Sequence, residues 1–199
     1  MPEGPLVFVD VDTQRDFLEP TGALYVPGSD RIMANLARLT AFARVRGIPV
    51  LATACAHTAE DVEEIARFGE HCMAGTPGQS RIEATAWPGG VVLEPSDTFQ
   101  GDPPAHLTVE KRAFDVMSRP DAARIVDRYN RDRPTFVVYG VATDFCVKAA
   151  AEGLLRGGCK VAIVVDAIRA IDVEREADVL GGLVAKGATL TLTEVVCGN

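Results

Sequence analysis

The stretch VYGVATDFCV, residues 138–147, joins the end of an expected strand to the start of an expected helix through a tight turn. The β-branched run at 135–139 predicts the strand, and Thr143 or Asp144 is placed to cap the helix that follows. Cys146 would then lie in the first helical turn, beside free backbone N–H groups and the positive end of the helix dipole. Such surroundings favour a thiolate and an oxyanion. Cys146 is therefore interpreted either as a nucleophile or as a small buried core residue.

Short apolar runs alternate with helical patterns along the rest of the chain. Further strands are expected at residues 6–11, 48–54, 91–93, 106–110, 161–165 and 189–195, and the main helices at 30–47, 59–68, 121–129 and 172–187. This alternation predicts an α/β fold, a doubly wound, mostly parallel sheet of about six strands with helices on both faces. No repeat, low-complexity tract or linker interrupts residues 1–199, so a single domain is expected.

Composition and charge narrow the classes of partner. The chain of 199 residues is 47% hydrophobic and 24% charged, as is ordinary for a globular protein. Its net charge of −8 argues against binding to nucleic acid or to an anionic membrane surface. No apolar run is long enough to span a bilayer and no leader pattern precedes the first strand, which favours a cytoplasmic location. The five cysteines fit no disulfide framework, so reduced thiols are expected.

Chemically capable side chains follow several of the expected strands at the point where each strand ends. Five residues share this placement: Asp12, Cys55, His57, Lys111 and Cys146. The carboxyl ends of parallel strands meet at one edge of a sheet, where ligands bind, so these side chains are expected to converge. Acyl transfer through a thiolate fits them, because Cys146 can attack a carbonyl while Asp12 moves the proton and Lys111 stabilises charge.

Structural interpretations stand beside these functional ones. In the structural interpretation, Asp12 is a solvated carboxylate at the end of a strand, and Asp10 or Asp16 has a structural role. Lys111 is then one half of a surface ion pair. His106, at the start of a strand beside prolines, is expected to be exposed.

The donor set Cys55, His57 and His71 combines imidazole nitrogens with a sulfur, as soft metal sites do, although its spacing matches no standard zinc motif. The histidines are otherwise polar loop residues. Three aromatic residues adjoin candidate site residues in sequence and are either core or the walls of a pocket for a flat ring: Phe17, Phe68 and Phe114.

The chain resembles the isochorismatase-like cysteine hydrolases, and within them the nicotinamidases, over nearly its whole length. Three motifs carry the resemblance: DTQRDF at 12–17, Lys111 followed by Phe114–Asp115, and GVATDFCV at 140–147. The resemblance implies a catalytic triad of Cys146, Asp12 and Lys111. It also implies a cis peptide between Val141 and Ala142, which aims the backbone N–H groups of Ala142 and Cys146 at the oxyanion.

The resemblance further implies a divalent metal, and here the sequence departs from the family. Nicotinamidases usually place Asp-x-His after the second strand, with another histidine further on. His57 and His71 match these histidines, but Cys55 stands where the aspartate is expected. A thiolate keeps that ligand anionic and shifts the preference towards zinc, so zinc on Cys55, His57 and His71 is predicted. Phe68 stands near a position where nicotinamidases often carry tryptophan.

The leading hypothesis is a cysteine amidohydrolase that cleaves a small, nicotinamide-like carboxamide to an acid and ammonia through a thioester. One alternative is hydrolysis of another small amide or carbamoyl compound, with the metal structural or absent. A second is a non-catalytic thiol or metal-binding protein that uses Cys55 and Cys72. The expected partner is a small amide, with no nucleic acid and no membrane, and assembly into a homo-oligomer is left open.

Overall fold

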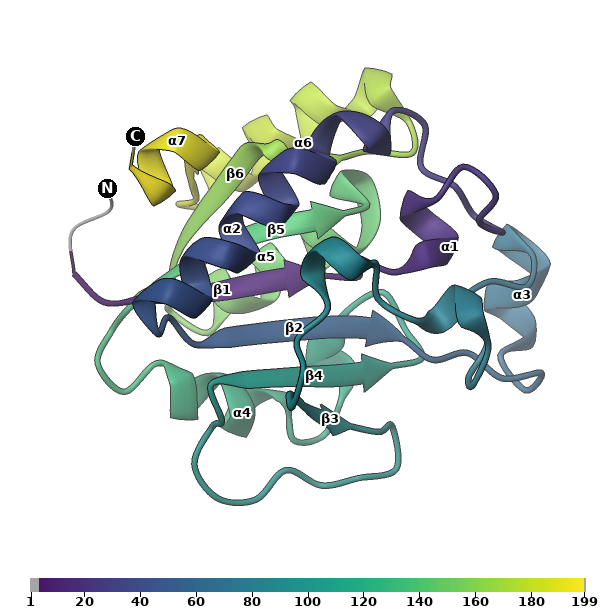
Figure 1. The fold of residues 1–199 in the computed structure, drawn as a ribbon, viewed down its shortest axis with the longest axis horizontal. Helices are drawn as coiled ribbons and strands as arrows, with labels where there is room; N and C mark the ends of the chain where they lie inside the picture. Colours follow the sequence, from purple (N-terminus) through teal and green to yellow (C-terminus); the bar gives the residue numbers. More distant parts are fainter. Residues whose placement is uncertain (1–3, 199) are drawn as a thin grey trace.

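The computed structural model describes residues 4–198, which are organised around one parallel sheet (Figure 1). Its strands are β1 (Leu6–Val11), β2 (Val50–Cys55), β3 (Val91–Leu93), β4 (His106–Lys111), β5 (Thr135–Val141), β6 (Lys160–Arg169) and β7 (Thr189–Thr191). They pair in the order β3-β4-β2-β1-β5-β6-β7, and every neighbouring pair is parallel. The predicted α/β class is confirmed, with seven strands in place of about six.

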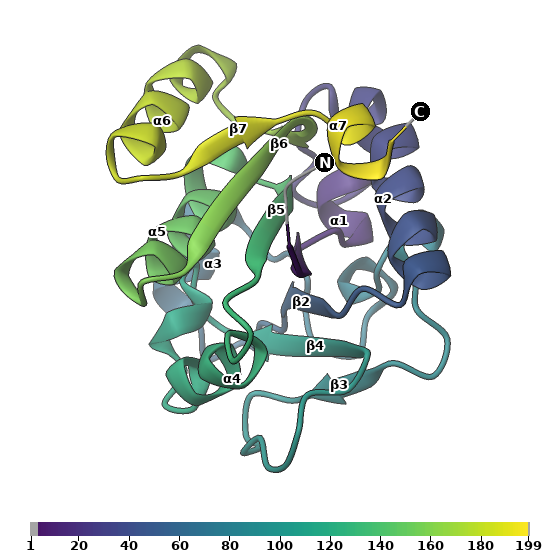
Figure 2. The ribbon, with the colours of Figure 1, turned by 90° about the vertical axis from the view of Figure 1, so that its left-hand side faces the viewer.

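Helices cover both faces of the sheet (Figure 2). One face carries α1 (Arg15–Leu18), α2 (Met33–Arg46) and α7 (Thr193–Cys197). The other carries α4 (Ala122–Tyr129), α5 (Lys148–Arg156) and α6 (Val173–Ala185). A seventh helix, α3 (Val62–Phe68), lies beyond the carboxyl ends of β2 and β4 (Figure 1). Within residues 4–198, no helix has both the length and the apolar character needed to cross a membrane.

Short turns of helix complete the connections. Four are 3₁₀ turns, at Ser29–Ile32, Pro77–Gln79, Glu83–Thr85 and Val116–Ser118, and a π turn spans Thr143–Val147.

The central strands are buried on both faces, which is why they read as continuous apolar runs. In β1, Val7 and Val9 join the core beneath α4 and α5, whereas Phe8 joins the core beneath α2. The register places Val11 beside both Thr53 of β2 and Gly140 of β5.

Gly140 permits the close approach of β5 to β1. Its φ is +115°, and a Cβ atom there would lie 2.0 Å from the carbonyl oxygen of Val11. Any side chain would force the two strands apart, so the turn that leads to Cys146 requires glycine.

Two predictions about where a helix begins and where a strand ends are wrong. Neither Thr143 nor Asp144 caps the helix, because the chain enters a π turn from Ala142. The Asp144 carboxylate instead accepts the backbone N–H groups of Ile171 and Asp172 at 3.1 Å. The strand expected at 189–195 ends at Thr191, and α7 begins at Thr193. The Asp166 carboxylate fixes this start, because it accepts both the N–H and the hydroxyl of Thr193.

His106 is buried, not exposed as predicted, with 4% of its surface accessible. Its ring stacks on Trp87 at a centroid distance of 5.0 Å, and neither ring nitrogen has a hydrogen-bond partner within the described part of the chain. Burial, reinforced by the positive charges of Arg81 and Arg44, lowers the pKa of His106 to about 4. The imidazole is therefore neutral in the folded protein at neutral pH.

This burial predicts a loss of stability in acid. Because the folded pKa lies below that of an exposed histidine, the unfolded chain binds the extra proton first, and stability falls as pH drops from about 6.5 to about 4. The contribution amounts to about 3 kcal/mol. Urea unfolding at a series of pH values should show a shallower decline for His106→Phe, which keeps a ring against Trp87 but cannot titrate. Equal declines in the two proteins would contradict the assignment.

Candidate active site

Four reactive side chains meet at the carboxyl edge of the sheet. Cys55 and Lys111 are register partners at the ends of β2 and β4. Asp12 follows β1 and lies in the left-handed region, with φ of +48°, while its N–H donates to the Thr53 carbonyl at 3.2 Å. Cys146 enters from the π turn that follows β5. Because β4, β2, β1 and β5 are consecutive in the sheet, their ends lie together.

A buried ion pair joins Asp12 to Lys111. The Lys111 Nζ atom lies 2.8 Å from Asp12 Oδ2, and the Thr53 hydroxyl donates to Oδ1 at 2.6 Å. Burial opposes the charge on Asp12, but the ammonium and these hydrogen bonds hold the pKa of its carboxyl below the ordinary value. Burial likewise opposes the charge on Lys111, yet the facing carboxylate keeps the pKa of the amine well above its usual range. Both groups are therefore charged.

The same ammonium faces two sulfur atoms. Lys111 Nζ lies 3.2 Å from Cys55 Sγ and 3.6 Å from Cys146 Sγ. The two sulfurs and an Asp12 oxygen all lie within 4.8 Å of one another. A hydrogen bond between the thiols is the main cause of opposite shifts, since it lowers the pKa of Cys55 to about 5 and raises that of Cys146 well above its usual range. Because the pKa of Cys146 is raised, its thiol needs a base to remove the proton before the sulfur can attack.

Gln14 fixes the end of β2, a role that the sequence analysis missed. Its side-chain amide donates to the carbonyl of Cys55 at 2.8 Å, and its carbonyl accepts the N–H of Cys55 at 2.7 Å. The feature of the sequence that could have pointed to this role is the position of Gln14 inside the motif at 12–17.

The carboxylates of Asp10 and Asp16, on either side of Asp12 in the sequence, have structural roles, as the structural interpretation of the sequence expected. Asp10 forms an ion pair with Arg81 and accepts the Thr13 hydroxyl at 2.8 Å. Asp16 accepts the backbone N–H of Cys72 at 2.6 Å, which fixes the loop that carries His71.

A second donor cluster contains two of the three predicted metal ligands. One ligating atom from each of His57, Glu64 and His71 lies within 4.8 Å of the others. Glu64 was not among the predicted ligands, because its sequence position indicated only the helix expected at 59–68. Cys55 groups instead with Asp12 and Cys146.

The donor chemistry of this cluster fits a divalent ion. Both ring nitrogens of His57 are buried with no hydrogen-bond partner among residues 4–198. His71 donates from Nδ1 to the Gly69 carbonyl at 2.9 Å, which leaves its Nε2 lone pair 3.9 Å from Glu64 Oε1. Two imidazoles and a carboxylate are ligands typical of zinc, and such an arrangement leaves an open coordination position.

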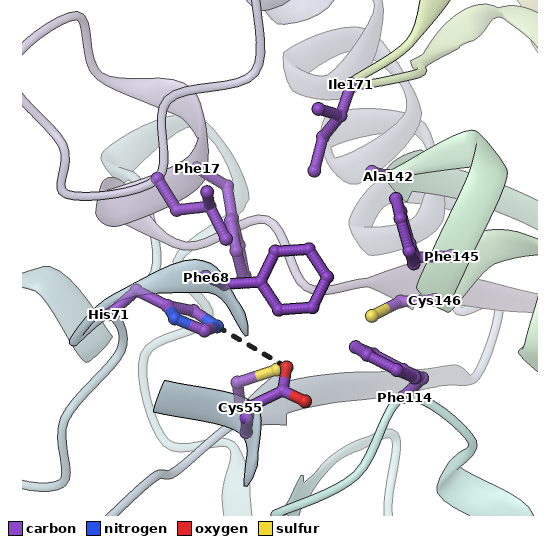
Figure 3. A pocket seen from close by; sticks show the side chains of 11 residues that line it. Phe17, Cys55, Phe68, His71, Phe114, Ala142, Phe145, Cys146 and Ile171 are labelled. Carbon is purple, nitrogen blue, oxygen red and sulfur yellow. Dashed lines mark ion pairs between the residues drawn. The ribbon is translucent and has the colours of Figure 1, made fainter. Parts of the chain in front are cut away.

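An aromatic pocket connects the two clusters (Figure 3). The rings of Phe68, Phe114 and Phe145 pack against one another at centroid distances of 5.4–5.7 Å, and the Arg67 guanidinium lies over all three. All three predicted pocket aromatics are in the lining, which consists of Phe17, Leu24, Cys55, Glu64, Phe68, His71, Phe114, Ala142, Phe145, Cys146 and Ile171. Figure 3 shows the Cys146 sulfur beside Phe114 and Phe145, and the dashed contact between His71 and Glu64. The peptide bond between Val141 and Ala142, at the pocket wall, is cis.

Residues 6–195 match a family model described as the isochorismatase domain. The chain belongs to the isochorismatase family. It is 29% identical to the nicotinamidase of Escherichia coli strain K12, over 94% of each chain. The chain is a hydrolase that acts on amide carbon–nitrogen bonds, as the sequence predicts.

Solved structures share the fold. The pyrazinamidase of Pyrococcus horikoshii, crystallised in complex with zinc, is 25% identical, with a TM-score of 0.76 over 95% of this chain and 99% of that chain. The N-carbamoylsarcosine amidase of Thermoplasma acidophilum has a TM-score of 0.75 at 24% identity, over 96% of this chain and 98% of that chain.

The buried ion pair predicts a strongly non-additive pattern of stability. Lys111→Met leaves the Asp12 carboxylate buried without a counter-charge and should cost about 3–5 kcal/mol of unfolding free energy. The double variant Asp12→Asn/Lys111→Met removes both charges and should be more stable than Lys111→Met alone. Urea unfolding of the two single variants and the double variant measures this coupling. A double variant as unstable as the sum of its single variants would show that the ion pair carries no coupling energy.

Proposed function

We propose that the chain hydrolyses a small, flat, nicotinamide-like carboxamide to its acid and ammonia through a thioester on Cys146. The observation that carries the proposal is the position of Lys111, whose ammonium contacts the Asp12 carboxylate at 2.8 Å and the Cys146 sulfur at 3.6 Å beside the aromatic pocket. A thiol, a base and a buried cation are the groups that thioester chemistry needs.

Asp12 acts as the base in the first half of the reaction. It takes the proton of the Cys146 thiol as the sulfur attacks the amide carbon, and the carbonyl oxygen gains the negative charge. The backbone N–H groups of Ala142 and Cys146 donate to this oxyanion. The carbon–nitrogen bond then breaks, and Asp12 returns the proton to the nitrogen, which leaves as ammonia.

A water molecule completes the second half. Asp12 removes a proton from the water as its oxygen attacks the thioester carbon. The carbon–sulfur bond breaks, the acid leaves, and the Cys146 sulfur takes the proton back. Lys111 remains charged throughout and keeps Asp12 ionised between the two halves.

Two features support a flat aromatic amide as the substrate. The pocket is lined by four phenylalanine rings, Phe17, Phe68, Phe114 and Phe145, which suit stacking against a planar ring. The relatives named nicotinamidase and pyrazinamidase take their names from ring carboxamides.

We also infer that His57, Glu64 and His71 hold a divalent metal ion, with zinc as the metal that fits these ligands best. Glu64 and His71 line the pocket, so the ion would offer its open position to a lone pair on the substrate. In this assignment Glu64 takes the place that the sequence analysis gave to Cys55.

The reaction predicts which cysteine is required. With nicotinamide as substrate, Cys146→Ala should lower the rate of ammonia release by about 10³-fold or more, because the thioester cannot form. Asp12→Asn should have a comparable effect. Cys197→Ala is the matched control, because it changes a cysteine outside the pocket. This variant should release ammonia at the rate of the unaltered protein. Unchanged turnover in Cys146→Ala would refute the mechanism. Ammonia released only from carbamoyl compounds would refute the substrate alone.

The metal assignment predicts a difference between adjacent glutamates. Glu64→Gln should weaken zinc binding by more than about 10-fold, because even loss of an outer-shell partner typically costs about 10–100-fold. Glu63→Gln, on the same helix but exposed, should bind zinc as the unaltered protein does. Competition with a chromophoric chelator measures both affinities without any substrate. Equal affinities in the two variants would remove Glu64 from the site.

A further inference from the structure

The proposed reaction leaves the sulfur of Cys55 without a role. Cys55 ends β2 with 4% of its surface exposed, and its sulfur lies within 4.8 Å of the Cys146 sulfur. Both cysteines line the same pocket, so a small molecule that reaches one sulfur also reaches the other (Figure 3).

The separation of the two sulfurs is within reach of a covalent bond. A disulfide requires the sulfurs to approach to about 2 Å, and rotation of a cysteine side chain moves its sulfur by that order of distance. Lys111 contacts both sulfurs, at 3.2 and 3.6 Å. The same cation can therefore stabilise a thiolate on either cysteine. The remaining cysteines, Cys72, Cys159 and Cys197, do not line the pocket.

We propose that Cys55 is a resolving cysteine, which forms a reversible disulfide with Cys146 when a hydroperoxide oxidises the site. The proposal of the disulfide rests on the position of the two sulfurs. Its effect on catalysis rests on the proposed function, in which Cys146 is the nucleophile.

The chemistry balances with hydrogen peroxide as the oxidant. Asp12 takes the proton of the Cys146 thiol, the sulfur attacks one peroxide oxygen, and the oxygen–oxygen bond breaks. Hydroxide is the leaving group, and Cys146 becomes a sulfenic acid. The Cys55 sulfur then attacks the Cys146 sulfur, the sulfur–sulfur bond forms, and the sulfur–oxygen bond breaks. The hydroxide ions take the two thiol protons, so two thiols and one peroxide give one disulfide and two waters.

This disulfide would protect the nucleophile. A sulfenic acid that meets no second thiol is oxidised further to sulfinic acid, which simple thiols do not reduce. A disulfide between Cys55 and Cys146 stops the oxidation at a level that a dithiol reverses. Peroxide would therefore switch the enzyme off without destroying it.

Peptide mapping of the unaltered protein is the primary test. The reduced protein is treated with a small excess of hydrogen peroxide, alkylated, digested without reductant and analysed by mass spectrometry. We expect a linked peptide pair that contains Cys55 and Cys146, with two of the five thiols lost. Sulfinic acid on Cys146 with Cys55 alkylated, or a link from Cys55 to Cys72, would overturn the proposal.

Activity and a matched pair of variants provide the second readout. After peroxide, dithiothreitol should raise the ammonia-release rate of the unaltered protein and of Cys197→Ser by about tenfold or more. Cys55→Ser should show no such recovery, since Cys146 would pass to sulfinic acid. Recovery in Cys55→Ser equal to that of the unaltered protein would overturn the proposal.

The two readouts separate this proposal from the proposed function. The mapping uses no substrate and no variant, so it stands even if Cys55→Ser does not fold or if nicotinamide is not hydrolysed. An active amidase with no linked peptide would refute the disulfide alone.

Discussion

The buried ammonium of Lys111 is the charge on which the active site depends. It stands at the end of β4 with 2% of its surface exposed and faces Asp12 together with two cysteine sulfurs. An isolated buried cation is costly, so this position demands anionic partners. The Asp12 carboxylate, 2.8 Å from Lys111, supplies that negative charge. A base that remains ionised beside a thiol that retains its proton is the state from which general-base attack begins.

The order of strands converts distant residues into neighbours. Four consecutive strands, β4, β2, β1 and β5, end side by side, and the reactive residues follow them directly. The rule that ligands bind at the carboxyl edge of a parallel sheet was sufficient to predict this convergence from the sequence. Apolar runs predicted the strands because both faces of the central sheet are covered, and Gly140 and the motif at 140–147 located the turn.

Other features could not be predicted from local patterns, because they depend on contacts between segments far apart in the chain. His106 is stacked on Trp87, whose ring also lies against the Arg44 guanidinium, although the neighbours of His106 in sequence suggested exposure. Glu64 becomes a possible ligand only when α3 packs beyond the strand ends and brings it to His57 and His71. Gln14 holds β2 through two backbone hydrogen bonds, which no periodicity reveals.

Cys55 shows how one substitution redistributes the roles of a site. A carboxylate at this position could accept hydrogen bonds or bind a metal, but it could not form a disulfide with Cys146. With cysteine there, the sulfur lies 3.2 Å from Lys111 and groups with Asp12 and Cys146, while Glu64 supplies the anionic oxygen beside the histidines. A sulfur bound in a disulfide cannot also hold a metal. Under the two proposals, metal binding and thiol chemistry therefore use different atoms of one pocket and do not compete.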